Sequence, residues 1–207
     1  MSGLLFVVSA ASGTGKTSLV KALLERVNNL HVSVSHTTRG QRLGELDGVH
    51  YHFSQKDDFL NLVNEGGFIE YAEVFGNYYG TAQATVKEQL AKGHDVLLEI
   101  DWQGAQQVRR LFPESKQIFI LPPSQFDLRE RLSNRGTDTV DVIEHRLSCA
   151  VEDMQQYSNF DYIIINDDFN KALHDLEAVI IANRLTLSQQ ANRHEKLIQQ
   201  LITPTEQ

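Results

Sequence analysis

The residues best suited to chemistry lie near the N-terminus, in a segment that ends in Gly15-Lys16-Thr17. An apolar run from Leu4 to Val8 precedes this segment, and a helical pattern follows it. That strand–loop–helix order is typical of a phosphate-binding loop, in which backbone N–H groups and a helix N-terminus hold phosphate oxygens. The full pattern has glycine at position 10, where this chain has alanine. The predicted loop consists of Ala10, Ala11, Ser12, Gly13, Thr14, Gly15, Lys16 and Thr17.

Two side chains at the end of this loop have distinct expected roles. Lys16 would reach a terminal phosphate, and the hydroxyl of Thr17 would be a ligand for Mg²⁺. The alternative is a glycine-rich turn before an ordinary helix. The strand before the loop and the helix after it favour the phosphate site.

Arginines form two groups, one near residue 40 and one within the charged segment 126–148. Guanidinium groups bind phosphate in bidentate fashion and stay charged at any working pH. Two such groups from different parts of the chain, together with Lys16, suit a site that holds two phosphorylated ligands end to end. The candidates are Arg39 and Arg42 in the first group, and Arg131, Arg135 and Arg146 in the second.

No Ser-His-Asp or Cys-His arrangement stands out in the sequence. His50 and His52 lie on one face of a predicted strand, but further zinc ligands are missing, so we interpret them as surface residues. Phosphoryl transfer to an acceptor that is itself a phosphate needs no strong general base, because the nucleophile is already an oxyanion. Catalysis would then depend on positioning and on charge neutralisation.

The composition limits the class of protein. A chain of 207 residues with 41% hydrophobic residues can bury a core as one domain with small insertions. The net charge of −8 argues against a nucleic-acid surface, so an anionic ligand must meet locally placed cations. Cys149 is the only cysteine, which fits a reducing compartment. Without a signal peptide or a long apolar run, we expect a soluble cytoplasmic protein that does not enter membranes.

Buried-strand patterns alternate with helical patterns along most of the chain. The strands are expected at 4–8, 32–35, 96–101, 117–121 and 162–165. This alternation predicts an α/β fold in which a five-stranded parallel sheet is covered by helices on both faces. The stretch 34–83 departs from it and reads as a mixed α+β insertion with strands at 49–53 and 68–75, a helix at 56–64 and a turn at 76–80.

The carboxyl ends of parallel strands share one edge of a sheet, where ligands bind in open α/β folds. The residues expected at this edge are the loop 9–17, Ser35, Asp101, Pro122 and Asn166. Their convergence predicts one shared site.

Several further segments, in this order along the chain, resemble those of guanylate kinases of the bacterial type, within the superfamily of nucleoside monophosphate kinases. The similarity runs from about Leu4 to Ala182 and includes the form of the loop with Ala10. The segments are Ser35-His36-Thr37-Thr38-Arg39, Arg42 with Gly44-Glu45, Gly76-Asn77-Tyr78-Tyr79-Gly80, Ile100-Asp101-Trp102-Gln103-Gly104, Arg135-Gly136 and Ile165-Asn166-Asp167-Asp168.

The resemblance implies a reaction and a domain organisation. The reaction is reversible transfer of the γ-phosphoryl group of ATP to GMP, giving ADP and GDP, with Mg²⁺ as cofactor. The fold would be a three-layer P-loop core formed by 1–33, 84–125 and 149–207, with a GMP-binding domain at 34–83 and a helical lid at 126–148. The two smaller parts would close over the ligands and exclude water.

The resemblance also assigns roles to single residues. ATP would be held by the loop from Ala10 to Thr17 with Arg131 and Asn166. Mg²⁺ would be held by Thr17, with Asp101 acting through water. The catalytic cations would be Lys16, Arg39, Arg42, Arg135 and Arg146. GMP would be held by Ser35, Arg39, Arg42, Tyr51, Glu70, Tyr79, Thr81, Glu99 and Asp101.

Guanine recognition by Glu70 also follows from chemistry. A carboxylate accepts hydrogen bonds from both N1–H and the exocyclic amine of guanine, whereas adenine presents a lone pair at N1. Hydroxyls of Ser35 and Thr81 can donate to the guanine O6. Two alternatives remain, a P-loop kinase for another nucleoside monophosphate and a non-catalytic guanylate-kinase-like binding module.

Overall fold

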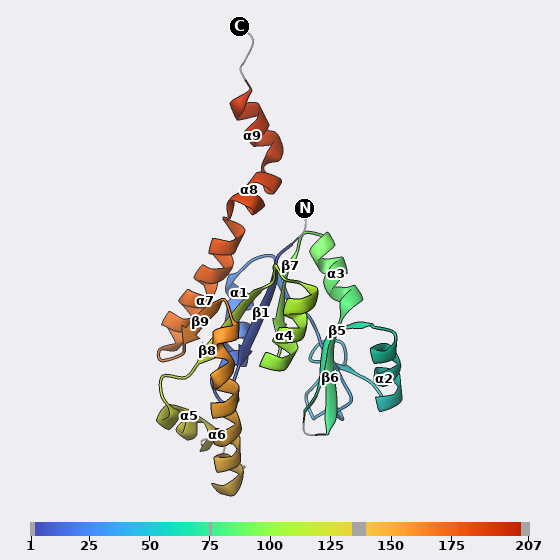
Figure 1. Ribbon diagram of the computed structural model, residues 1–207, viewed down its shortest axis with the longest axis vertical. Coiled ribbons are helices and arrows are strands. Elements are labelled where there is room, and N and C mark those ends of the chain that lie inside the picture. Colours follow the sequence, from blue (N-terminus) through green and yellow to red (C-terminus); the bar gives the residue numbers. More distant parts are fainter. Residues whose placement is uncertain (1–2, 75, 134–139, 204–207) are drawn as a thin grey trace.

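The computed structural model describes residues 3–74, 76–133 and 140–203. The fold of these residues is built on two β-sheets (Figure 1). Among these residues the larger sheet has five parallel strands in the order β2-β7-β1-β8-β9. They are β1 (Leu5–Ala10), β2 (Leu30–Val32), β7 (Asp95–Glu99), β8 (Lys116–Leu121) and β9 (Tyr162–Ile165). Because all strands are parallel, their carboxyl ends share one edge. The predicted α/β class and five-stranded parallel sheet are confirmed.

Alternation of side chains along β1 builds the three layers. Phe6 and Val8 point to one face and pack with helices α1 (Lys16–Arg26) and α7 (Phe169–Arg184). Leu5 and Val7 point to the other face and pack with α3 (Gln83–Ala91) and α4 (Trp102–Leu111). A strand that is apolar on both sides must be buried on both sides, as in parallel sheets covered by helices.

The second sheet is inserted between β2 and α3. Among the described residues it has four strands in the order β4-β3-β6-β5, with one parallel pair and two antiparallel pairs. Helix α2 (Lys56–Asn64) lies beside it, as Figure 1 shows. The strands are β3 (His36–Thr37), β4 (His52–Phe53), β5 (Phe68–Val74) and β6 (Asn77–Ala82). The predicted mixed α+β insertion is therefore confirmed.

The predicted turn at 76–80 is wrong, because β6 runs through most of it. The turn residue is Gly76, whose φ of 76° suits glycine, and Phe75 lies outside the described residues. Gly80 belongs to the strand for a packing reason: a Cβ there would lie 3.0 Å from Cζ of the buried Phe59. The prediction interpreted Gly80 as a turn residue, whereas its small size provides space for the ring of Phe59.

Two other predicted strands differ in the structure. Strand β2 (Leu30–Val32) overlaps the strand predicted at 32–35 only at Val32, because the chain then crosses from the large sheet to β3. The strand at 49–53 is reduced to β4, so His50 precedes it, and the Nδ1 of His50 accepts a hydrogen bond from the N–H of Leu46 at 3.0 Å.

The later part of the chain is mainly helical. The charged segment after β8 contains α5 (Gln125–Ser133) and α6 (Val140–Met154), followed by the 3₁₀ helix η1 (Gln155–Asn159). Beyond α7, helices α8 (Leu187–Arg193) and α9 (Glu195–Ile202) lead away from the body of the molecule, as Figure 1 shows. None of the helices in the described ranges combines the length and apolarity needed to cross a membrane.

The buried Asp95 ties three elements together at the edge of the sheet opposite the loop. Its carboxylate accepts hydrogen bonds from the N–H of Leu4 and from Nε of Arg184, both at 2.7 Å. We expect Asp95→Ala to lower the free energy of unfolding by about 2–3 kcal/mol, because both donors lose their partner. Urea unfolding followed by fluorescence measures this loss. Glu177→Ala, which removes the solvent-accessible Arg26–Glu177 pair, is the control and should cost less than about 1 kcal/mol. Equal losses would contradict the prediction.

Candidate active site

The loop between β1 and α1 has the shape of an anion cradle. It surrounds a cavity of about 330 Å³ lined by residues 10–18. Gly13 and Gly15 have φ values of 89° and 93°, a conformation that side chains other than glycine disfavour. A Cβ on Gly15 would also lie 2.5 Å from Nδ2 of Asn166. Helix α1 begins directly after Gly15, so its N-terminus faces the cradle, where it would favour an anion such as phosphate.

Lys16 lies where this cradle meets a second cavity. Its Nζ donates to the carbonyl oxygen of Ile100 at 3.1 Å, which holds the ammonium group at the carboxyl end of β7. Burial lowers the pKa of Lys16, and the carboxylates of Glu99 and Asp101 oppose that shift. Lys16 and Thr17 line both cavities, so one cation and one hydroxyl face both.

Thr17 and the acids after β7 form an oxygen-rich corner. The hydroxyl of Thr17 donates to Oε1 of Glu99 at 2.5 Å, which leaves its oxygen lone pairs for another partner. Asp101 caps helix α4 by accepting from the N–H of Gly104 at 2.8 Å. Among the described residues no group of three or more acidic, histidine or cysteine side chains could hold a metal. Mg²⁺ still fits this corner, because it binds through few protein oxygens together with water and phosphate.

Cations from the late helices reach the loop. Arg131 on α5 donates to the carbonyl oxygens of Thr14 and Asn166, at 3.3 and 2.9 Å. Asn166, after β9, donates from Nδ2 to the same Thr14 oxygen at 2.6 Å. Arg146 on α6 donates to the hydroxyl of Ser12 at 2.9 Å. These three predicted residues therefore gather around the loop, whereas the predicted Arg135 lies outside the described residues.

The second cavity has a volume of about 490 Å³ and lies between the two sheets. Its buried polar centre is Glu70 on β5, which accepts a hydrogen bond from the hydroxyl of Thr81 at 2.6 Å. The Ser35 and Thr81 hydroxyl oxygens are 3.4 Å apart. Burial raises the pKa of Glu70 to about 7, although the Thr81 hydrogen bond opposes the shift. A buried carboxyl next to two hydroxyls can recognise a ligand edge that carries adjacent N–H groups and an oxygen.

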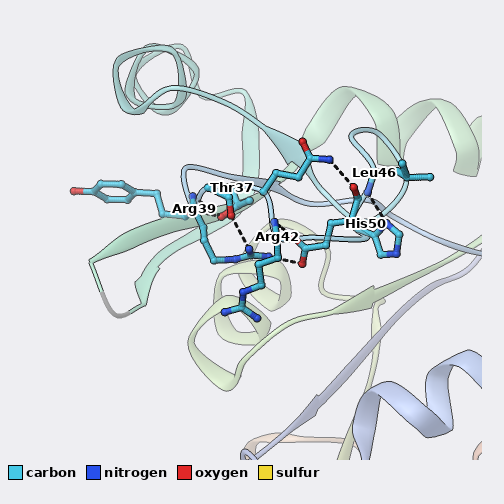
Figure 2. Close-up of polar contacts among 9 residues, drawn as sticks. Thr37, Arg39, Arg42, Leu46 and His50 are labelled. Atoms are coloured by element: carbon cyan, nitrogen blue, oxygen red, sulfur yellow. Dashed lines mark hydrogen bonds and ion pairs between the residues drawn. The ribbon is translucent and has the colours of Figure 1, made fainter. Parts of the chain in front are cut away.

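Arg39 and Arg42 of the first arginine group lie in one loop after β3 (Figure 2), and Glu45 of the same loop lines the cavity. Glu45 pairs with Nη2 of Arg39 at 2.7 Å and accepts from the N–H of Arg42 at 2.8 Å. The hydrogen bond from Arg39 lowers the pKa of Glu45 to about 2, and the same bond raises that of Arg39. The guanidinium carbon of Arg39 lies 5.4 Å from the ring centre of Tyr51, which in turn lies 5.9 Å from that of Tyr79.

The structure brings most of the predicted acceptor-side residues together, but to different degrees. Ser35, Tyr51, Glu70, Tyr79, Glu99 and Asp101 line the second cavity. Thr81 and Arg39 contact lining residues without lining it themselves. Arg42 is exposed and does not line the cavity. Glu99 accepts a hydrogen bond from Thr17 of the loop, so it also belongs to the oxygen-rich corner beside the loop, a position that its assignment to GMP did not include.

Three features of the site were not assigned a role from the sequence. Glu45 organises the arginine loop, although the sequence showed only an acid in a polar segment. Gly104 provides space, because a Cβ there would lie 2.8 Å from Oε2 of Glu70. Trp102 donates from Nε1 to Asp153 at 2.9 Å and so connects α4 to α6. All three residues stand in the segments that resemble guanylate kinases, and Gly104 is also a glycine inside a helical pattern, but no role was assigned to them.

The raised pKa of Glu70 predicts a stability cost at neutral pH. Since the native state holds the proton up to about pH 7 and the unfolded state releases it near 4.5, Glu70 lowers the stability of the protein as pH rises between these values. Glu70→Gln should therefore unfold with a free energy about 3 kcal/mol higher than the wild type at pH 8, and about equal to it at pH 4. Denaturant unfolding at both pH values measures this. Glu73→Gln, at an exposed position of the same strand, is the control. A gain independent of pH would contradict the prediction.

Comparison with known proteins agrees with this geometry. The family model for guanylate kinase matches residues 2–183. A guanylate kinase of Acinetobacter baylyi is 88% identical over 204 residues, which cover 99% of both chains, and one of Psychrobacter arcticus is 57% identical over 98% of both. The crystal structure of guanylate kinase from Anaplasma phagocytophilum superposes with a TM-score of 0.78 at 32% identity, covering 98% of this chain and 97% of that one. The chain belongs to the guanylate kinase family.

Proposed function

We propose that the chain transfers the γ-phosphoryl group of ATP to GMP by positioning and charge neutralisation, without a dedicated general base. The products would be ADP and GDP, and the reaction would be reversible. The observation that carries this proposal is the pair of cavities that share Lys16 and Thr17, one a phosphate cradle and the other centred on Glu70. Such an arrangement suits a donor and an acceptor that meet at their phosphates.

The donor ATP would lie in the loop from Ala10 to Thr17. Arg131 and Asn166 would contact it from the side on which both donate to the Thr14 carbonyl. The hydroxyl of Thr17 would hold Mg²⁺, with Asp101 acting through water, and the ion would neutralise charge on the β- and γ-phosphates. Glu99 would orient Thr17, because the hydroxyl can donate to Glu99 and still offer a lone pair to the metal.

The acceptor GMP would fill the second cavity. Glu70 would accept from N1–H and the exocyclic amine of guanine, and Ser35 and Thr81 would donate to O6. The GMP phosphate would bind Arg39, Arg42, Tyr51 and Tyr79. In this interpretation Glu45 holds Arg39 and the Arg42 backbone in place before the phosphate arrives.

The acceptor phosphate is itself the nucleophile, so the residues need only align it with the γ-phosphoryl group and stabilise negative charge. Lys16 lines both cavities, so its ammonium group would lie where that charge develops. Arg146 would approach the transferring group from α6, and we extend the same role to Arg135. Exclusion of water would prevent hydrolysis of the donor.

The proposal includes three structural units and a location. The core would comprise 1–33, 84–125 and 149–207, the GMP-binding domain 34–83 and the lid 126–148. Closure of the two smaller units would bring the arginine groups to the phosphates. The reaction would take place in the cytoplasm, where both nucleotides are available.

The choice of acceptor is tested with GMP, AMP, CMP and UMP in a coupled assay of ADP release. GMP should react far faster than the other three, because a buried carboxylate rejects an edge that cannot donate to it. Glu70→Gln should lower the ratio of GMP to AMP rates by about 10- to 100-fold, the effect of losing hydrogen bonds to a charged group. The KM for ATP should stay unchanged, and Glu73→Gln is the control.

Comparable wild-type rates with AMP would favour a kinase for another monophosphate. Absence of turnover with all four, together with intact GMP binding, would favour a non-catalytic binding module. Either result would overturn the proposed function.

Lys16→Met tests the charge-neutralising mechanism. The variant should stay folded while kcat falls by at least about 100-fold, because a cation that stabilises the transition state is removed. Lys21→Met, at an exposed position on the same helix, should leave kcat unchanged. Thermal unfolding of both variants checks the fold, and a near-normal kcat in folded Lys16→Met would exclude this mechanism.

A further inference from the structure

In the part of the chain that the structure describes, strand β5 lies at the edge of the second sheet, and one side of its backbone has no neighbouring strand. At Tyr71 the side-chain amide of Gln107 takes that place. The N–H of Tyr71 donates to Oε1 of Gln107 at 3.1 Å, and Nε2 of Gln107 donates to the Tyr71 carbonyl at 2.9 Å. One side chain thus satisfies both outward backbone groups of a single residue, as a paired strand would.

The clamped residue is next to Glu70 in the chain. On its other side β5 pairs with β6, with Glu70 opposite Thr81 and Tyr71 opposite Gly80. The backbone around Glu70 is therefore held from both sides, by β6 and by Gln107. A shift of Tyr71 would move the Glu70 carboxylate in the cavity.

Helix α4 has a second contact with this part of β5, at Gly104, about one turn before Gln107. Gly104 precedes Gln107 by three residues, so both lie on the same face of the helix. A Cβ at Gly104 would lie 2.8 Å from Oε2 of Glu70, so the helix backbone comes close to that carboxylate. The same helix is capped by Asp101, which lines the cavity. Helix α4 therefore links Glu70 to the edge of the large sheet, where Lys16 is held.

We propose that Gln107 is a positioning residue that fixes Glu70 relative to Lys16 and Asp101 by clamping the Tyr71 backbone to helix α4. The inference rests on the proposed role of Glu70 in guanine recognition. Gln107 touches neither substrate in this scheme and acts through the backbone of β5. When the Gln107 amide is removed, the N–H and carbonyl of Tyr71 can bind water instead, because Tyr71 is 42% exposed. The fold should survive, while the placement of the carboxylate is lost.

The experiment compares Gln107→Ala and Gln107→Glu with Gln106→Ala, which removes a side-chain amide from the preceding position of the helix. Gln107→Glu keeps the acceptor for the Tyr71 N–H but cannot donate to the carbonyl. Both Gln107 variants should raise the KM and the Kd for GMP by about tenfold or more, because small misplacement of a positioned group is costly. The KM for ATP should stay within about twofold of wild type, and Gln106→Ala should change neither constant.

Amide hydrogen exchange tests the clamp without activity. The Tyr71 N–H should exchange faster in Gln107→Ala than in wild type or Gln106→Ala, while core amides of β1 keep their protection. An unchanged GMP Kd in the folded Gln107 variants would overturn the proposal. Equal increases in the KM for GMP and for ATP would also overturn it, because they would indicate a general structural role.

A double variant separates this inference from the role of Glu70. If Gln107 acts through Glu70, Gln107→Ala should have little further effect on GMP binding in the Glu70→Gln background. If Glu70→Gln alone leaves GMP selectivity unchanged, the proposed recognition fails and this inference fails with it. If Glu70→Gln relaxes selectivity but Gln107→Ala has no effect, only the clamp is wrong.

Discussion

The close contact between helix α4 and strand β5 is the constraint on which the site depends. Within residues 3–74, 76–133 and 140–203 the two sheets share no strand pairing, so packing and side-chain hydrogen bonds place the insertion. Gly104 allows the helix to come near Glu70, and Gln107 binds the next residue of the strand. This contact helps to define the position of the Glu70 carboxylate relative to the loop of the other sheet.

Electrostatics explain how a chain with a net charge of −8 can hold two anionic nucleotides. The acids Glu70, Glu99 and Asp101 surround Lys16, each with a hydrogen-bond partner that sets its place. Cations approach from opposite sides, Arg39 from the insertion and Arg146 from α6. Binding of phosphate therefore depends on where the fold places a few charges, and the total charge says little about it.

The sequence predicted well those parts whose physics is local. Helix 56–64 and strand 162–165 were predicted with their observed bounds, because periodicity and flanking glycine or polar residues define them. The turn at 76–80 was predicted wrongly. Gly80 is needed there because the ring of Phe59, a residue distant in the chain, leaves no space for a side chain. Arg131, Arg146 and Asn166 were expected near the loop from the resemblance, and the structure places them there.

By itself the sequence determined the phosphate-binding loop, the alternating α/β order and the set of residues shared with guanylate kinases. These depend on residue type and short spacing, which a linear chain displays directly. Only the tertiary structure decided the hydrogen bond between Thr17 and Glu99, the order that Glu45 imposes on the arginines, and the clamp of Gln107 on Tyr71. Each of these contacts depends on the distance and direction between folded elements. Sequence periodicity shows which face of an element is buried, but it does not show which group lies opposite that face.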